Sequence, residues 1–212
     1  MPAAANGASA TICCDQSHSS MDVVRSAWAR ITAYAEHEDS RTASANLIAL
    51  VVASNQPFYI LYLYALIGGG EKLAPSFLTL LSTPFFLAVP FASRRSSIAG
   101  RALLVLTGIG NAIVSTKAFG VEAGIGMFLI PCALIAAALF KPRERLLGFL
   151  LIGLCGVVHF AFADLYGAPL ANYTASDFAA MSSLNAVSAT TLVIFVGLLM
   201  SSALADADGR RG

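Results

Sequence analysis

The chain has 212 residues, of which 57% are apolar and only 12% charged, and its mean hydropathy is +0.74. Soluble domains average about 25% charged residues, so this composition excludes an ordinary soluble protein and indicates a bilayer environment. The net charge of +1, with no basic patch interleaved with aromatic residues, gives no sign of a nucleic-acid partner.

The N-terminal region is polar and precedes the apolar part of the chain. Residues 1–20 contain no apolar run of the kind found in cleaved signal peptides, and we expect them to form a disordered cytoplasmic tail. Residues 21–42 place apolar side chains on one helical stripe, at Val24, Trp28, Ile31 and Ala35. This stripe predicts a short amphipathic helix, which either lies on the membrane surface or packs on cytoplasmic loops.

Six apolar runs follow, each close to the length of about 20 residues that crosses about 30 Å of hydrocarbon. They cover residues 44–67, 73–92, 98–116, 119–140, 146–166 and 178–204. The sequence therefore predicts an all-α polytopic membrane protein, with a bundle of six transmembrane helices over residues 43–205. We expect residues 206–212 to form a second cytoplasmic tail and the lipid bilayer to be the first partner of the chain.

The basic residues alternate between the two sides of this predicted bundle. Eleven of the 13 Lys and Arg residues lie in the N-terminal region, in or at the margins of the connections after the second and fourth runs, or at the C-terminus. The other connections carry only Lys72 and Lys117. Because Lys and Arg collect on the cytoplasmic side, we expect six crossings with both termini in the cytoplasm.

Proline and glycine mark irregular positions in three of the runs. Pro57 and Pro84 lie inside the first and second predicted helices, where proline removes a backbone hydrogen bond, so we expect a kink at each. Gln56 or its neighbour Asn55 would satisfy the freed carbonyl or face an interior polar path. Gly120 and Gly124 form a G-x-x-x-G pattern, which predicts close approach of a neighbouring helix.

Polar stripes in three of the runs lie at a shared depth, about 7–11 Å below the outer boundary. Polar side chains in lipid are costly unless they face the bundle interior, so the stripes are expected to converge. The hypothesis is an outward-facing pocket for a signal or solute, lined by Asn111, Glu122, His159, Asp164 and Asn185. In this pocket His159 would respond to external pH. The alternative is that the amides and the histidine form interhelical hydrogen bonds and that Glu122 caps a helix N-terminus.

Residues that commonly perform catalysis do not form a recognisable set. The four cysteines and three histidines show no metal-ligand spacing, and neither a nucleophilic triad nor a phosphate-binding loop is visible. We therefore expect no metal, no cofactor and no enzymatic activity.

The sequence resembles the six-helix N-terminal sensor regions of bacterial histidine kinases, class III adenylate cyclases and diguanylate cyclases. The resemblance covers roughly residues 40–204 and rests on a basic amphipathic lead-in followed by NQPFY, FGVEAGIGMFLIPCALIAAALF with KPRER, and MSSLNAVSATTL. In those proteins the last crossing leads into a signalling helix and a catalytic domain, whereas here LADADGRRG ends the sequence.

The resemblance implies an integral inner-membrane sensory or signal-transducing module without an output domain of its own. Such a module would act through a protein partner or as a homo-oligomer. A small-solute carrier or channel is the alternative from another functional class, and a remnant of a membrane-anchored cyclase or kinase is the second alternative.

Overall fold

The computed structural model describes residues 25–26, 29–30, 32–162 and 165–209. Contacts divide the chain into two units, Met1–Glu36 and His37–Gly212, and each is described by itself. In the first unit residues 25–26, 29–30 and 32–35 are helical. The expected tail at 1–20 and the stripe residues Val24, Trp28 and Ile31 lie outside the described residues, so the amphipathic surface helix stays a prediction.

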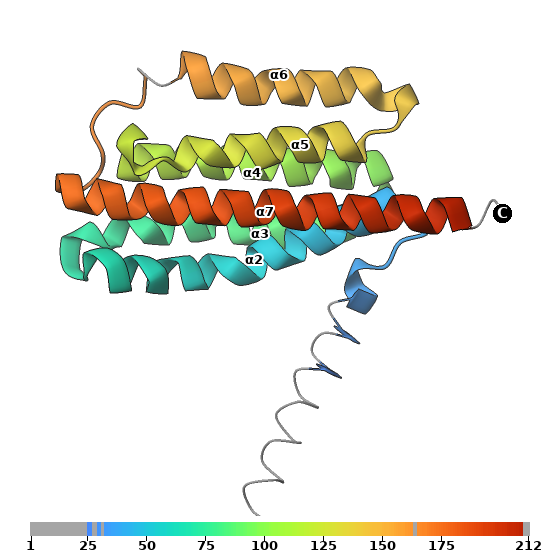
Figure 1. The fold of residues 1–212 in the computed structure, drawn as a ribbon, viewed down its shortest axis with the longest axis horizontal. Coiled ribbons are helices and arrows are strands. Elements are labelled where there is room, and N and C mark those ends of the chain that lie inside the picture. The colour runs from blue at the N-terminus through green and yellow to red at the C-terminus, as the bar shows by residue number, and fades with distance from the viewer. Residues whose placement is uncertain (1–24, 27–28, 31, 163–164, 210–212) are drawn as a thin grey trace, which may run out of the picture. The chain divides into compact units, whose positions relative to one another are not determined.

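The second unit is a bundle of helices that lie side by side (Figure 1). Its main elements are α2 (Ser40–Ile67), η2 (Ala74–Ser82), α3 (Thr83–Arg95), α4 (Ser97–Phe119), α5 (Leu129–Leu139), α6 (Arg145–Ala161) and α7 (Ala175–Gly209). Five helical spans are long and apolar enough to cross a membrane, and the shorter apolar segment Ile125–Leu139 accompanies them. The described residues contain no strand, and the all-α membrane bundle expected from the sequence is confirmed.

Helix α4 lies at the centre of the bundle and α6 at its edge. Helix α4 packs against α2, α3 and α5, and it buries side chains around its circumference, among them Leu104, Ile109 and Ala112. Helix α6 packs mainly on α5 and lies at one edge of the bundle in Figure 1. Its buried residues form one narrow face, which consists of Gly148, Leu151, Cys155 and Val158.

The fourth apolar run is not the single helix expected over residues 119–140. Gly120 and Gly124 have φ angles of 90° and 74°, which end regular helix because such values favour glycine. Between and after them the chain forms two 3-10 turns, η3 (Val121–Ala123) and η4 (Ile125–Phe128), before α5 begins. The two glycines therefore break the crossing close to its start.

The second run is also divided. Its first part is the 3-10 helix η2, and Pro84 lies in the first turn of the following helix α3. A proline in the first turn removes no hydrogen bond within α3, so Pro84 marks the start of this helix directly after η2, and the kink expected there stays a prediction. Pro57 lies inside α2, which runs from Ser40 to Ile67 as one helix.

The two ends of the bundle carry different polar contacts. We call the end where α2, α4 and α6 begin the Arg101 end, and the opposite end, where α7 begins, the Lys72 end. Helix α7 runs from the Lys72 end to Gly209, so residues 206–209 of the expected tail are helical, and residues 210–212 lie outside the described part.

Candidate functional site

A cavity of about 810 Å³ lies within the bundle. Its walls come from α2, η2, α3, α4, η4, α5 and α7, so nearly every element of the bundle contributes to it. Most lining side chains are apolar, including Ile48, Phe86, Leu104 and Phe195. This volume falls in the range of about 300–1,000 Å³ that small-molecule sites occupy.

One wall of the cavity is polar, where α2, η2 and α4 meet. Gln56 Nε2 donates a hydrogen bond of 2.9 Å to Ser82 Oγ. The Ser82 hydroxyl in turn lies 2.8 Å from the carbonyl oxygen of Thr79 and 3.0 Å from Asn111 Oδ1. A hydroxyl has one proton, so Ser82 can donate to only one of these two acceptors at a time. The Asn111 oxygen is therefore unpaired whenever Ser82 donates to Thr79.

Ser115 lies one turn beyond Asn111 on α4 and also lines the cavity. It is 4% exposed, and its Oγ has no hydrogen-bond partner among the described residues. The Nδ2 group of Asn111 makes no hydrogen bond within the described part of the chain either. Buried polar atoms are nearly always hydrogen-bonded, so the Ser115 hydroxyl, on a residue that lines the cavity, is a group that a ligand or a water could pair with.

The described lining residues carry no charged side chain. Asn55, Thr79, Ser188 and Thr191 add polar groups, but none of the described residues around the cavity is Asp, Glu, Lys, Arg or His. The cavity therefore offers hydrogen bonds without offering a counter-charge.

Of the five residues predicted to line an outward-facing pocket, Asn111 lines this cavity. Asn185 is fully buried beside it, where its Oδ1 accepts a hydrogen bond of 3.1 Å from Tyr59 and its Nδ2 donates one of 2.8 Å to the carbonyl of Ala123. Tyr59 lines the cavity, so Asn185 contributes through this tyrosine.

The structure does not bring Glu122 and His159 into the cavity. Glu122 is exposed in the turn η3, where its carboxylate forms neither a helix cap nor a hydrogen bond with the described residues. His159 is exposed on α6, with its ring edge-on to Phe160 at 4.8 Å between centroids. Asp164 lies outside the described residues, and the five-residue pocket stays a prediction.

Gly124 lies against α7 at the point where the two 3-10 turns meet. A Cβ atom added to Gly124 would lie 2.8 Å from Ser182 Oγ and 3.3 Å from Ser182 Cα. At Gly120 the corresponding distances to Phe178 and Pro169 are 3.5 Å. The start of the fourth crossing is therefore held close to the first turns of α7.

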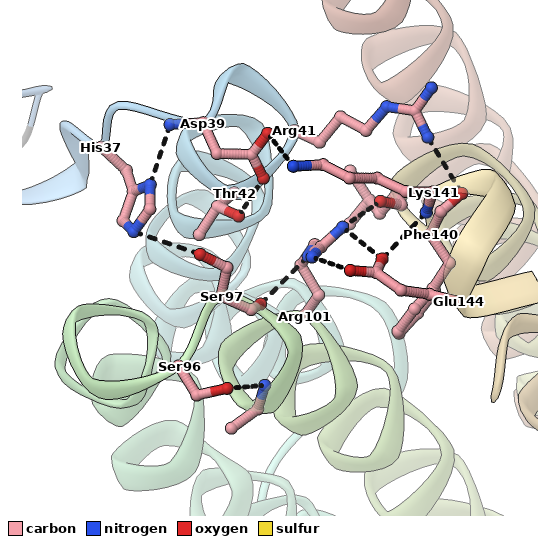
Figure 2. Close-up of polar contacts among 12 residues, drawn as sticks. His37, Asp39, Arg41, Thr42, Ser96, Ser97, Arg101, Phe140, Lys141 and Glu144 are labelled. Atoms are coloured by element: carbon pink, nitrogen blue, oxygen red, sulfur yellow. Dashed lines mark hydrogen bonds and ion pairs between the residues drawn. The ribbon is translucent and has the colours of Figure 1, made fainter.

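The Arg101 end is closed by a network of charged side chains (Figure 2). Arg101 is 1% exposed, and its guanidinium donates to the carbonyl oxygens of Ser97 (3.0 Å) and Leu139 (2.6 Å). It also forms an ion pair of 3.0 Å with Glu144. Arg41 donates a hydrogen bond of 2.9 Å to the carbonyl of Phe140. This network joins the first turns of α2 and α4 to the connection between α5 and α6.

Asp39 takes part in the same network immediately before α2. Its carboxylate accepts a hydrogen bond of 2.7 Å from Thr42 Oγ1 and forms an ion pair of 2.9 Å with Lys141. Partial burial alone would raise the pKa of Asp39, but the Thr42 hydrogen bond and the Lys141 ammonium outweigh it and hold the pKa below its ordinary value of 3.8. The ionised form of Asp39 therefore stabilises this end of the bundle.

This arrangement predicts an acid dependence of stability. A carboxyl group with a lowered folded-state pKa contributes fully above its unfolded pKa of about 4, and the contribution is lost as the pH falls through the folded value. Between about pH 4 and pH 2 we expect the melting temperature of the wild type to fall more than that of Asp39→Asn. The difference corresponds to less than about 1 kcal/mol, because the Lys141 partner is partly solvated. Glu38→Gln, at an exposed position, should keep the wild-type dependence, and equal acid dependence of all three proteins contradicts the prediction.

Different contacts hold the elements together at the Lys72 end. Lys72 forms an ion pair of 2.6 Å with Asp177 in the first turn of α7. Lys117 donates to the carbonyl oxygens of Tyr166 (2.8 Å) and Ala168 (3.0 Å), which fixes the loop before α7 onto the end of α4. Tyr173 donates to the Lys72 carbonyl, and burial together with the Asp177 carboxylate raises the pKa of Tyr173 to about 12. The phenol therefore stays protonated at neutral pH.

Sequence reasoning missed two features of the site. It placed Arg101 among the cytoplasmic loop charges, although its position four residues into α4 is a signal that it could turn inward. It also left open whether Gln56 satisfies the carbonyl freed by Pro57 or faces an interior polar path, and it did not connect Gln56 with Ser82 and Asn111, to which the structure links it. The described residues contain no cluster of His, Cys, Asp and Glu that could hold a metal ion.

A family model named MASE7, which represents membrane-associated sensor domains, matches residues 32–208. No curated protein and no solved structure shows significant similarity to the chain. The match begins before α2 and reaches the last turn of α7. The chain belongs to the MASE7 family of membrane-associated sensor domains, and it is a multi-pass helical membrane protein.

Proposed function

We propose that the bundle is the receiving part of a bacterial signal-transduction system and performs no reaction of its own. It detects a ligand in the cavity and passes the change along α7 to an output that lies outside the bundle. The observation that carries this proposal is the course of α7, which connects the Lys72 end, the cavity wall and the Arg101 end in one helix.

Three parts of α7 support this role. Its first turn holds the Asp177 ion pair with Lys72, and its middle supplies Leu184, Ser188 and Leu192 to the cavity. It then continues to Gly209, which gives 35 residues in all. At 1.5 Å per residue the helix is about 52 Å long, which exceeds a hydrocarbon thickness of about 30 Å. A shift of α7 at the cavity would therefore be carried to a point beyond the membrane.

The resemblance to kinase and cyclase sensor regions agrees with this reading. In those proteins the last crossing leads into a signalling helix, and α7 occupies the same position in this chain. The output would be carried by a protein partner, by a second copy in a homo-oligomer, or by another part of the same polypeptide.

The proposal is tested by fusing the full chain to the catalytic domain of a class III adenylate cyclase. One to seven alanines are inserted at the junction, and cyclic AMP is measured in cells. If α7 transmits as a continuous helix, output should depend on helical phase, because each residue rotates the fusion by about 100°. Insertions of two or five residues should lower output, and seven residues, close to two full turns, should restore it.

Gly-Ser insertions of the same lengths are the matched control, since a flexible linker loses helical phase. Output that ignores the length of the alanine insertion, or that follows the Gly-Ser series, would show that α7 does not transmit the signal.

The orientation of the bundle is a separate prediction. The Arg101 end carries most of the basic residues, so we expect this end and both termini to face the cytoplasm of a cell with an inner membrane. Reporter fusions after Gly212 and within residues 170–176 should therefore report opposite sides of the membrane. Reports from the same side would rule out this topology.

A small-solute carrier is the second candidate function. The observation that favours it is the broken fourth crossing beside the cavity, since discontinuous helices line the substrate sites of many transporters. Solute uptake into proteoliposomes containing only this chain would support the carrier, and its absence together with phase-dependent output would support the sensor.

A further inference from the structure

The cavity reaches the surface of the bundle between α2 and α7. Asn55 and Phe58 on α2 and Val187 on α7 line the cavity and are also exposed, with Val187 66% exposed. A hydrogen bond of 3.1 Å joins Tyr59 on α2, eight residues before the end of that helix, to Asn185 on α7, ten residues after its start. Asn55 lies twelve residues before the end of α2 and Val187 twelve residues after the start of α7, so both are about 18 Å from the Lys72 end.

This depth is near the middle of both candidate spans. A surface opening at the middle of a membrane span faces hydrocarbon and not water. A molecule that enters there must first dissolve in the bilayer, which selects for apolar compounds. The exposed amide of Asn55 at this depth supplies a polar group at the opening itself.

The lining excludes ionised ligands. Transfer of a carboxylate or an ammonium group into an apolar site without a partner charge is highly unfavourable. No Asp, Glu, Lys, Arg or His is found among the described residues that line the cavity, so no counter-charge is available. The occupant must therefore be neutral.

The polar wall specifies what the occupant carries. Ser115 Oγ can donate and accept, Asn111 Nδ2 can donate, and Asn111 Oδ1 accepts when Ser82 donates to Thr79. These groups lie within one turn of α4 and suit a single hydroxyl or carbonyl group. The remaining walls are mostly apolar, with scattered polar groups such as those of Asn55, Ser188 and Thr191, and suit a chain or ring.

We propose that the cavity binds a neutral amphiphile, with one hydroxyl or carbonyl group at Asn111 and Ser115 and an apolar body along α2 and α7, which enters from the bilayer between these two helices. The signalling consequence of this binding rests on the function proposed above, whereas the binding itself does not.

The test uses a photoreactive probe: dodecan-1-ol with a diazirine in the chain and an alkyne at the tail. The full-length protein is reconstituted in phosphatidylcholine nanodiscs, irradiated with increasing probe, and the labelled peptides are mapped by mass spectrometry. We expect saturable labelling in residues 51–62 and 184–195. Excess dodecan-1-ol should compete, whereas dodecane, which lacks the polar group, and dodecanoate, which is charged, should not.

Two substitutions test the polar wall. Asn111→Leu keeps the approximate size of the side chain, and Ser115→Ala removes a hydroxyl that has no hydrogen-bond partner among the described residues. Each should weaken saturable labelling about five- to tenfold, the loss expected for one hydrogen bond of this kind. Ser183→Ala, at an exposed position of α7 that does not line the cavity, is the matched control and should leave labelling unchanged. Ser115→Ala keeps the test valid if Asn111→Leu fails to fold.

The route is tested with the double variant Asn55→Trp, Val187→Trp, which narrows the opening. It should slow labelling by membrane-dissolved probe, and an unchanged labelling rate overturns access between α2 and α7.

Three outcomes overturn the binding site: labelling that does not saturate, equal competition by dodecane, or labelling that neither polar substitution changes. Saturable labelling without phase-dependent output in the cyclase fusions would support the binding site and overturn the sensory role. Phase-dependent output without saturable labelling would support the sensory role and overturn the binding site.

Discussion

We expect Arg101→Met to lower the free energy of unfolding by about 3–5 kcal/mol, the range found when one partner of a buried ion pair is removed. The loss is large because the guanidinium satisfies three groups at once: the carbonyls of Ser97 and Leu139 and the carboxylate of Glu144. Without it the Glu144 carboxylate loses its buried partner between α4 and α6. Thermal unfolding in detergent, followed by helical circular dichroism, measures the change.

Arg143→Met is the matched control, because Arg143 is an exposed arginine at the same end of the bundle. It should change stability by less than about 0.5 kcal/mol. Adding Glu144→Gln to Arg101→Met should recover part of the loss, since the unpaired charge is then removed. Equal melting temperatures for the Arg101 and Arg143 variants would show that the network does not hold this end together.

Gly124→Leu should destabilise the bundle by about 2–5 kcal/mol. A side chain at φ 74° costs about 1–2 kcal/mol, and the overlap with Ser182 adds a packing cost of about 1–3 kcal/mol. Because Ser182 Cα lies only 3.3 Å from the added Cβ, rotation of the Ser182 side chain cannot relieve the overlap. Gly124→Ala should give a smaller loss in the same direction.

Gly153→Leu on α6 provides the comparison, because a Cβ at Gly153 meets nothing within 4 Å. It adds the same side chain at an exposed helical position and should leave the melting temperature nearly unchanged. If Gly124→Leu and Gly153→Leu melt alike, the contact between η3, η4 and α7 contributes little to stability.

The sequence predicted the bundle well because long apolar runs have few physical alternatives in a bilayer. Its prediction of the fourth crossing as one helix failed because glycine permits helix as readily as the positive φ values at Gly120 and Gly124. Tertiary contacts with α7 select between these conformations, and they are not visible in the local sequence.

The candidate site was predicted in part. Depth along a helix follows from counting residues, but the direction a side chain faces depends on which neighbours surround the helix. Asn111 lies on the central helix α4 and reaches the cavity. His159 lies on the peripheral helix α6, where the narrow buried face contains Cys155 and Val158, and the next position is already exposed. Counting residues along α6 therefore could not show that the His159 side chain lies on the exposed face of the helix.

Ser115 Oγ has no hydrogen-bond partner among the described residues, which would link ligand binding to stability. A buried polar atom without a partner costs about 1–3 kcal/mol, and a ligand oxygen at this position would remove that cost. Ligand binding and folding are then linked, so the melting temperature should rise with the logarithm of ligand concentration once the site is saturated. Ser115→Ala should raise the melting temperature of the unliganded protein and reduce the further rise on ligand addition. The reason is that the substitution removes the unpaired hydroxyl and the ligand pairs it, so both remove the same energetic cost.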